Sequence, residues 1–322
     1  MTDEENGGLR HFPVLSREIL GRMIPEHGPL KVIDGTVGYG GHSSLILKKN
    51  PEAVLLGIDR DCEALENARK ILMFAGERVR LVKDCYSNLA ERAAENGWFS
   101  ADLVLLDLGI SSPQIDSPER GFSYSLDGPL DMRMDPESGK TAADILNSSG
   151  EGELERIFRE YGEIRESRRL ARVICADREI GKRWNGTADF ADFCNRILGR
   201  RRRPGLQAAT LCFQALRIAV NNELKELEKA LPLALEILAP GGKIAVISFH
   251  SLEDRIVKNF FRRESKDCLC PPENFTCTCG HRKRLELITK KPIMAGSDEV
   301  EENRRSSSAK LRIAEKIELG YG

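Results

Sequence analysis

The sequence predicts an α/β protein with a doubly wound, mostly parallel sheet and an inserted helical domain. Three observations support this prediction. Short apolar runs alternate with helical patterns in the first third of the chain, an order of elements that produces a parallel sheet. A glycine-rich turn follows the first apolar run, and an acidic residue follows the second. The last apolar run of this type comes only after a long stretch of helical pattern.

Five apolar runs are the predicted parallel strands, at residues 30–33, 54–58, 78–82, 103–106 and 243–249. Each is short and bounded by polar residues or glycine, as expected of buried strands. This regular order predicts helices on both faces of the sheet.

The connecting helices are predicted from apolar residues three and four positions apart. Ser16 and Ser87 are expected to cap two of them, and a third covers residues 61–75. Residues 285–289 and 309–316 have strand-like patterns and predict an antiparallel hairpin that ends the sheet.

The long gap between the fourth and fifth strands divides the chain into two domains. We assign residues 1–117 and 216–322 to the sheet domain and residues 118–215 to the helical insert. Two pairs have the spacing of capping boxes, Thr141 with Asp144 and Ser251 with Asp254.

The bulk composition excludes several classes of protein. Lys and Arg number 49 and Asp and Glu 50, so the net charge of −1 gives no overall attraction to nucleic acid or membrane. No apolar stretch approaches the roughly 20 residues needed to span a bilayer. The polar N-terminus does not resemble a signal peptide, and nine cysteines without one indicate a reducing, cytoplasmic location.

Basic charge is concentrated in the insert. Residues 151–205 contain thirteen arginines and one lysine against ten acidic residues, including the run Arg200 to Arg203. Isolated arginines of this kind are usually paired on a solvated helix face. The continuous run favours contact with nucleic-acid phosphates, which arginine binds in a bidentate manner.

The glycine-rich turn predicts a cofactor site. The segment from Asp34 to Ser43 reads D-G-T-V-G-Y-G-G-H-S, and Asp59 ends the next strand. A glycine turn followed by an acid about 20 residues later is typical of adenosine-containing cofactors, with the acid bonding the ribose. Ser43 stands where a dinucleotide fingerprint has its last glycine, so the match to a nicotinamide dinucleotide site is incomplete. The pattern also suits S-adenosylmethionine, and both cofactors remain candidates. The predicted terminal hairpin favours the second.

A second candidate site follows the fourth strand, at Asp107-Leu108-Gly109-Ile110-Ser111-Ser112-Pro113-Gln114. Ligands of such sheets bind beyond the carboxyl ends of the strands. Enzymes that methylate exocyclic amines carry a polar residue, two prolines and an aromatic residue here. Asp107 with Ser112 and Pro113 matches part of that pattern, without the aromatic residue.

Five motifs together resemble the bacterial ribosomal RNA small-subunit methyltransferase H family, also called MraW. They read D-G-T-x-G-x-G-G-H-S, L-L-D-L-G-I-S-S-P-Q, G-F-S-Y-x-x-D-G-P-L-D-M-R-M-D, F-Q-A-L-R-I-x-V-N-x-E-L and I-S-F-H-S-L-E-D-R-I-V-K. The similarity extends from about His11 to Ile317. It implies a class I methyltransferase core with an inserted helical domain. It also implies transfer of a methyl group from S-adenosylmethionine to N4 of a cytidine in the decoding region of 16S ribosomal RNA, cytosine 1402.

The resemblance also assigns roles to residues. Those that it places at the cofactor are Gly38, Gly40, Gly41, His42, Asp59, Tyr86, Asp107 and Gln114. Asp107, Ser111 and Ser112 are the candidate catalytic acceptors for the target amine. Arg133, His250 and Arg255 are the candidate contacts to RNA. The expected partner is the small ribosomal subunit or its RNA.

Four cysteines form a separate cluster. Cys268, Cys270, Cys277 and Cys279 have the spacing C-x-C-x6-C-x-C, followed by His281. Four thiolates in a short loop suit a structural zinc ion, although the usual pairs are C-x2-C. The sequence therefore favours a loop of reduced thiols, with a structural zinc ion as the alternative.

Two other functions are compatible with parts of the sequence. A nicotinamide-dependent dehydrogenase would share the glycine turn and Asp59. A non-catalytic RNA-binding or ribosome-assembly factor would keep the cofactor pocket and the basic insert without transferring a methyl group.

Overall fold

The structure is a computed structural model that describes residues 13–199, 201–203, 206–274 and 276–318, with only the backbone described at 201–203 and 206. The chain forms two compact units. The sheet unit holds the described residues up to Gly109 and from Leu227 onward, and the helical unit is Ile110–Glu226. The sequence placed the insert at 118–215, so both of its boundaries lie inside the helical unit seen here.

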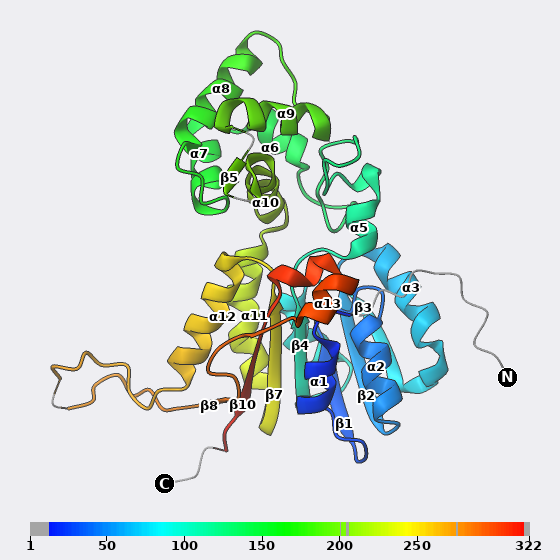
Figure 1. Ribbon diagram of the computed structural model, residues 1–322. Helices are drawn as coiled ribbons and strands as arrows, with labels where there is room; N and C mark the ends of the chain where they lie inside the picture. The colour runs from blue at the N-terminus through cyan, green and yellow to red at the C-terminus, as the bar shows by residue number, and fades with distance from the viewer. Residues whose placement is uncertain (1–12, 200, 204–205, 275, 319–322) are drawn as a thin grey trace. The chain divides into compact units, whose positions relative to one another are not determined.

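The sheet unit is built on an eight-stranded sheet (Figure 1). Its strands are β1 Leu30–Asp34, β2 Ala53–Asp59, β3 Val79–Lys83, β4 Ala101–Asp107, β7 Leu238–Ser248, β8 Leu285–Leu287, β9 Ile293–Met294 and β10 Lys310–Lys316. Their order is β3-β2-β1-β4-β7-β10-β8, with β9 beside β10. The first five are parallel, and β10 is antiparallel to β7, β8 and β9. The predicted fold class is confirmed.

The end of the sheet is more elaborate than the predicted hairpin. β8 and β10 do pair in antiparallel fashion. Between them in sequence lie β9 and the helix α13 Ser297–Glu302. β10 lies between β7 and β8 in the sheet and also pairs with β9, the strand that precedes it in the chain.

Alternating side chains cover both faces of the sheet. Val32 and Leu55 pack into one apolar cluster and their neighbours Ile33 and Leu56 into another, because successive strand residues point to opposite faces. On the first face lie α1 Ser16–Met23, α2 Gly41–Lys49 and α3 Cys62–Leu72. On the second lie α4 Leu89–Glu95, α11 Glu223–Ile237 and α12 Ser251–Glu264.

Two predicted helix caps are wrong. Ser16 lies inside α1, whose N-cap is Leu15 in a left-handed conformation. Ser87 lies within a short 3-10 helix, Tyr86–Asn88, that precedes α4. The 3-10 turn moves the cap of α4 by one residue, from Ser87 to Asn88, and spacing in the sequence alone did not indicate it.

The helical unit has its own apolar core. Its elements are α5 Ser112–Asp116, the 3-10 helix Pro118–Arg120, α6 Ala142–Ser148, α7 Glu151–Glu160, α8 Ser167–Glu179, α9 Thr187–Leu198, β5 Arg201–Arg203, β6 Leu206–Gln207 and α10 Ala208–Asn221. Trp184, Phe190 and Phe193 are almost fully buried and in mutual ring contact. The predicted capping box of Thr141 and Asp144 is confirmed at the start of α6.

The predicted arginine run is only partly described. Arg200 lies outside the described residues, and residues 201–203 form β5, which pairs with β6. Among the helices that the structure describes, none is long and apolar enough to cross a membrane.

Candidate functional site

The glycine turn connects the carboxyl end of β1 to the start of α2. β1 ends at Asp34, and α2 begins at Gly41 after Gly40, which has φ +84°. A Cβ atom on Gly40 would lie 3.3 Å from Leu72 Cγ, so both the backbone conformation and the space favour glycine. No side chain caps α2. Its first N–H groups therefore point into the turn without an intrahelical partner, as at a typical anion-binding helix start.

Asp59 lies at the end of β2 beside this turn. Its carboxylate accepts hydrogen bonds from the backbone N–H groups of Gly38, at 2.8 Å, and Asp61, at 3.0 Å. Burial raises the pKa of Asp59, although both of these hydrogen bonds oppose the shift. The predicted acid and the predicted glycine turn are thus joined directly.

Asp34 and Ser43 form a buried hydrogen bond between their side chains, which was not predicted. Ser43 Oγ donates to Asp34 Oδ2 at 2.6 Å, and Thr36 N donates to Asp34 Oδ1 at 3.2 Å. Burial raises the pKa of Asp34 to about 6 against these two hydrogen bonds. The sequence did contain a signal for this hydrogen bond, since Asp34 and Ser43 are the polar residues at the two ends of the D-G-T-V-G-Y-G-G-H-S segment. Polar side chains that are buried on either side of such a turn need hydrogen-bond partners.

Asp107 is held against the same turn. Its backbone N–H donates to Thr36 Oγ1 at 2.6 Å, which fixes the end of β4 to the end of β1. His42 Nε2 lies 3.4 Å from Asp107 Oδ2, and the His42 side chain is 7% exposed. Among the described residues, His42 Nε2 and Asp107 Oδ1 are buried without a hydrogen-bond partner. Buried polar atoms of this kind are normally satisfied, so a ligand is their natural partner.

Tyr86 approaches the turn from the third strand. It follows β3, in the 3-10 helix Tyr86–Asn88. A Cβ atom added to Gly35 would lie 3.0 Å from Tyr86 Cβ and 2.6 Å from Leu106 Cδ2. The glycine is therefore needed for Tyr86 to pack close to the turn. The structure brings Gly38, Gly40, His42, Asp59, Tyr86 and Asp107 to one edge of the sheet.

Ser111, Ser112 and Gln114 lie at the start of the helical unit. Ser111 caps α5: its Oγ accepts from Gln114 N, and Gln114 Oε1 accepts from Ser111 N at 3.0 Å. Ser112 is the first residue of that helix. This capping role was not predicted, although Ser at the cap and Gln three residues later is its usual signature.

Arg133 is paired within the helical unit. Its Nε and Nη2 atoms donate to the two oxygens of Asp131, at 2.8 and 2.7 Å. This bidentate ion pair leaves both groups about one-fifth exposed. Any contact between Arg133 and RNA would therefore involve a guanidinium group that is already paired with the Asp131 carboxylate.

His250 caps α12 in place of the predicted pair. The capping box joins His250 with Glu253, one position before the predicted Ser251 and Asp254. The imidazole Nδ1 accepts from Glu253 N at 3.4 Å, a role that sequence rules assign to hydroxyl and carboxylate side chains. Asp254 instead pairs with Arg312 at 2.7 Å. Arg255 is exposed on α12.

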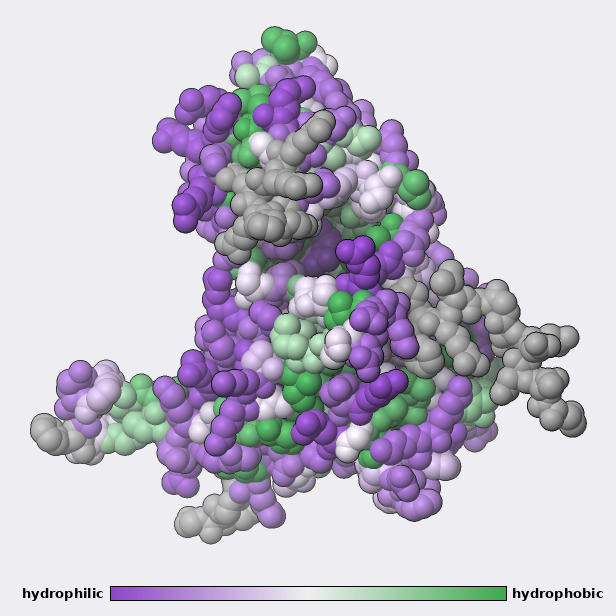
Figure 2. All heavy atoms as spheres, viewed as in Figure 1, coloured by the Kyte–Doolittle hydropathy of each residue, from purple (hydrophilic) through white to green (hydrophobic). Residues whose placement is uncertain are grey.

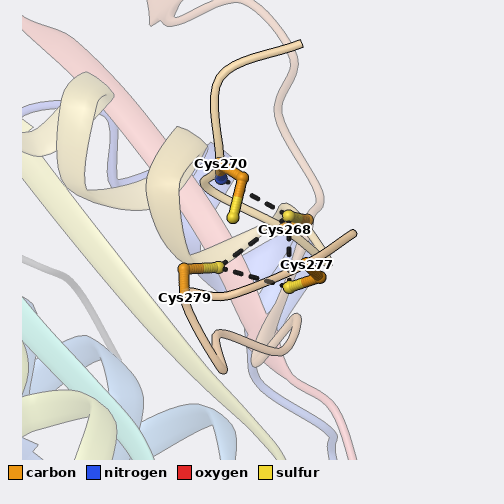
Figure 3. Close-up of side chains that lie close together, drawn as sticks. All are labelled: Cys268, Cys270, Cys277 and Cys279. Atoms are coloured by element: carbon orange, nitrogen blue, oxygen red, sulfur yellow. Dashed lines mark hydrogen bonds between the residues drawn. The ribbon is translucent and has the colours of Figure 1, made fainter. Parts of the chain in front are cut away.

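The four cysteines of the predicted cluster do come together. They lie in the segment between α12 and β8, where their sulfur atoms converge (Figure 3). Of the other cysteines, Cys194 and Cys212 are buried in the helical unit and Cys62 is exposed at the start of α3.

Comparison with known proteins identifies the family. Residues 8–317 match the MraW methylase family. The chain is 47% identical to the ribosomal RNA small subunit methyltransferase H of Heliobacterium modesticaldum, over 96% of this chain and 99% of the relative. It is 48% identical to the protein of the same name from Solidesulfovibrio magneticus, over 95% of each chain.

These matches cover the motifs of both units and nearly the full length of the relatives. They indicate that the glycine turn belongs to a methylase and not to a dehydrogenase. The chain therefore belongs to the MraW methylase family.

Proposed function

We propose that this protein transfers a methyl group from S-adenosylmethionine to N4 of a cytidine in the decoding region of 16S ribosomal RNA. Family membership and the names of the relatives support the reaction and the class of RNA. The observation in the structure that best supports it concerns His42 and Asp107. His42 Nε2 and Asp107 Oδ1 lie beside the glycine turn, buried and without a hydrogen-bond partner among the described residues. Cytosine 1402 is the expected target.

The turn suits the polar groups of the proposed donor. The open start of α2 at Gly41 and His42 favours a carboxylate, because unpaired N–H groups and the helix dipole attract negative charge. Asp59 is proposed to accept hydrogen bonds from the ribose hydroxyls. Tyr86 offers an aromatic face for the adenine ring, and Gln114 is proposed as a further contact to the donor.

Asp107 is proposed as the acceptor for the cytosine amine. When bound, S-adenosylmethionine supplies an electrophilic methyl group whose bond to sulfur breaks as nitrogen forms its bond to carbon. The cytosine amine is a weak nucleophile because its lone pair is delocalised into the ring. A hydrogen bond to Asp107 Oδ1 would turn that lone pair toward the methyl carbon, and the same carboxylate would then accept the released proton. Ser111 and Ser112 are proposed as additional acceptors.

The target base has to leave its stack to reach the end of β4, as it does in other enzymes that modify bases. Arg133, His250 and Arg255 are the proposed contacts to the RNA. Arg255 is exposed, whereas the side chains of Arg133 and His250 are 22% and 9% exposed.

The decisive experiment is methyl transfer to small ribosomal subunits from a strain that lacks this protein. Tritiated S-adenosylmethionine should label the 16S RNA, and nucleoside mass spectrometry should identify N4-methylcytidine. Binding of the subunit without label would favour an assembly factor. A thermal shift with NADH and none with S-adenosylmethionine would contradict the proposed donor.

A further inference from the structure

The segment between α12 and β8 has little apolar material of its own. It runs from Ser265 to Arg284, and the four cysteines lie in its exposed middle. Figure 2 shows this segment, which we name the cysteine loop, projecting from the surface of the sheet unit. Its one larger apolar side chain among the described residues from 266 to 282, Leu269, is 40% exposed. A loop of this kind needs another source of order than burial.

The sulfur atoms provide a compact centre. Cys268 Sγ lies 3.4 Å from Cys277 Sγ and 3.8 Å from Cys279 Sγ, and the last two are 3.6 Å apart. All four sulfurs lie within 4.8 Å of one another. Disulfide sulfurs would be about 2.05 Å apart. Four thiolates around a zinc ion, with bonds of about 2.3 Å, would instead place their sulfurs about 3.8 Å apart.

Backbone N–H groups are directed at these sulfurs. Cys279 Sγ accepts from the N–H groups of Leu269 and His281, at 3.3 and 3.4 Å. Cys270 Sγ accepts from Thr278 N at 3.3 Å. Such donors stabilise the thiolate form and fix the direction of the sulfur lone pairs, as the groups around bound metal ligands do.

We propose that Cys268, Cys270, Cys277 and Cys279 bind one Zn²⁺ ion that holds the cysteine loop together. Four thiolate ligands complete a tetrahedral site and leave no open position for water or substrate, so the ion is structural. Four thiolates and Zn²⁺ carry a charge of −2. Residues 262–284 hold more basic than acidic side chains, which favours this charge; the basic ones are Arg262, Arg263, Lys266, Arg282, Lys283 and Arg284, and the acidic ones are Glu264, Asp267 and Glu273. Arg263, Lys283 and Arg284 are already paired with carboxylates.

His281 connects the site to the rest of the unit and is not one of the ligands. Its Nε2 atom lies 3.1 Å from the carbonyl oxygen of Arg263, in the last turn of α12. Arg284 N donates to Glu264 O at 2.8 Å. The C-terminal end of the loop is thus attached to the end of α12, where the loop begins, and the metal closes the middle.

Metal analysis of the full-length protein, purified in the presence of a reductant, tests the proposal directly. We expect about one zinc ion per chain by mass spectrometry of the metal. The double variant Cys268→Ser/Cys277→Ser should lose nearly all of it. Cys62→Ser, which removes an exposed cysteine elsewhere in the sheet unit, should retain it.

Cobalt substitution provides a second measurement. Co²⁺ added to the metal-free protein should give the visible absorption of a tetrahedral thiolate site, and the double variant should not. Calorimetric binding of S-adenosylhomocysteine should persist in that variant, which shows that it remains folded. A wild-type protein without metal or cobalt absorption, or with Cys268 and Cys277 joined in a disulfide, would overturn the proposal.

Discussion

The edge of the sheet and the cysteine loop belong to the same unit but are ordered in different ways. At the edge, Asp34, Thr36 and Asp107 are fixed by strands whose apolar residues are fully buried. In the loop, the polar and sulfur groups are fixed mainly by one another. The first site is therefore organised by the core before any ligand binds, whereas the cysteine loop depends on its proposed metal ion for order.

The largest expected effect is on catalysis. Asp107→Ala should reduce methyl transfer to small subunits on the order of 10²–10³-fold, because it removes a preorganised acceptor for the amine. Single-turnover transfer of tritiated methyl groups measures this. Asp102→Ala is a matched control, since Asp102 lies at the opposite end of β4 and accepts only a bond from Lys31 N at 2.8 Å in the described contacts. Equal rates for Asp107→Ala and the wild type would remove Asp107 from the proposed role.

Next in size is a dependence of stability on pH at the preorganised edge. Burial raises the pKa of Asp34 in the folded state to about 6, from its usual value of 3.8. The contribution of Asp34 to the free energy of unfolding is therefore fully present below pH 3.8, where the carboxyl is protonated in both states, and is lost as the pH rises to about 6. Relative to Asp34→Asn, the wild type should lose about 3 kcal/mol of unfolding free energy across this window.

Urea denaturation of both proteins at several pH values checks this expectation. The difference between them should fall between pH 4 and pH 7 and then level off. A difference that stays constant, or that grows with pH, would contradict the burial of an ionisable Asp34.

A smaller effect is expected at Gly40. Gly40→Ala places a Cβ at φ +84° and 3.3 Å from Leu72 Cγ, which should cost about 1–3 kcal/mol of stability and weaken binding of the donor. Gly139→Ala is the control: its φ is +81°, but nothing lies within 4 Å of the added atom. Denaturation and calorimetry should show the larger loss, and the loss of donor binding, only for Gly40→Ala.

The smallest expected effect joins the two regions. Removing metal with a strong chelator should expose the cysteine loop to proteases while changing the affinity for S-adenosylhomocysteine by about twofold or less. Independent sites in one protein usually influence each other by no more than about 0.5 kcal/mol. A tenfold loss of affinity on chelation would show that the loop helps to order the edge.

Much of the sheet could be predicted from the sequence. Runs such as 54–58 and 103–106 are strongly apolar and end at an acidic residue, so both the strands and the positions of Asp59 and Asp107 followed directly. The resemblance then assigned Tyr86, which spacing alone did not single out.

The remaining features depend on contacts that spacing does not encode. His250 caps α12 because its ring nitrogen reaches Glu253 N, and Arg133 is held by Asp131 two residues away. The bond between Asp34 and Ser43 requires both residues to be buried together. In each case several residues nearby in sequence could have been the hydrogen-bond partner, and the fold of the backbone decides which of them comes within reach.

The position of β10 has a consequence for synthesis on the ribosome. β10 lies between β7 and β8 although β8 precedes it in the chain. Until residues 310–316 emerge, β7 presents an unpaired edge and β8 has no neighbour to join. Nascent chains at this stage should therefore be prone to edge-to-edge association and should rely on chaperones.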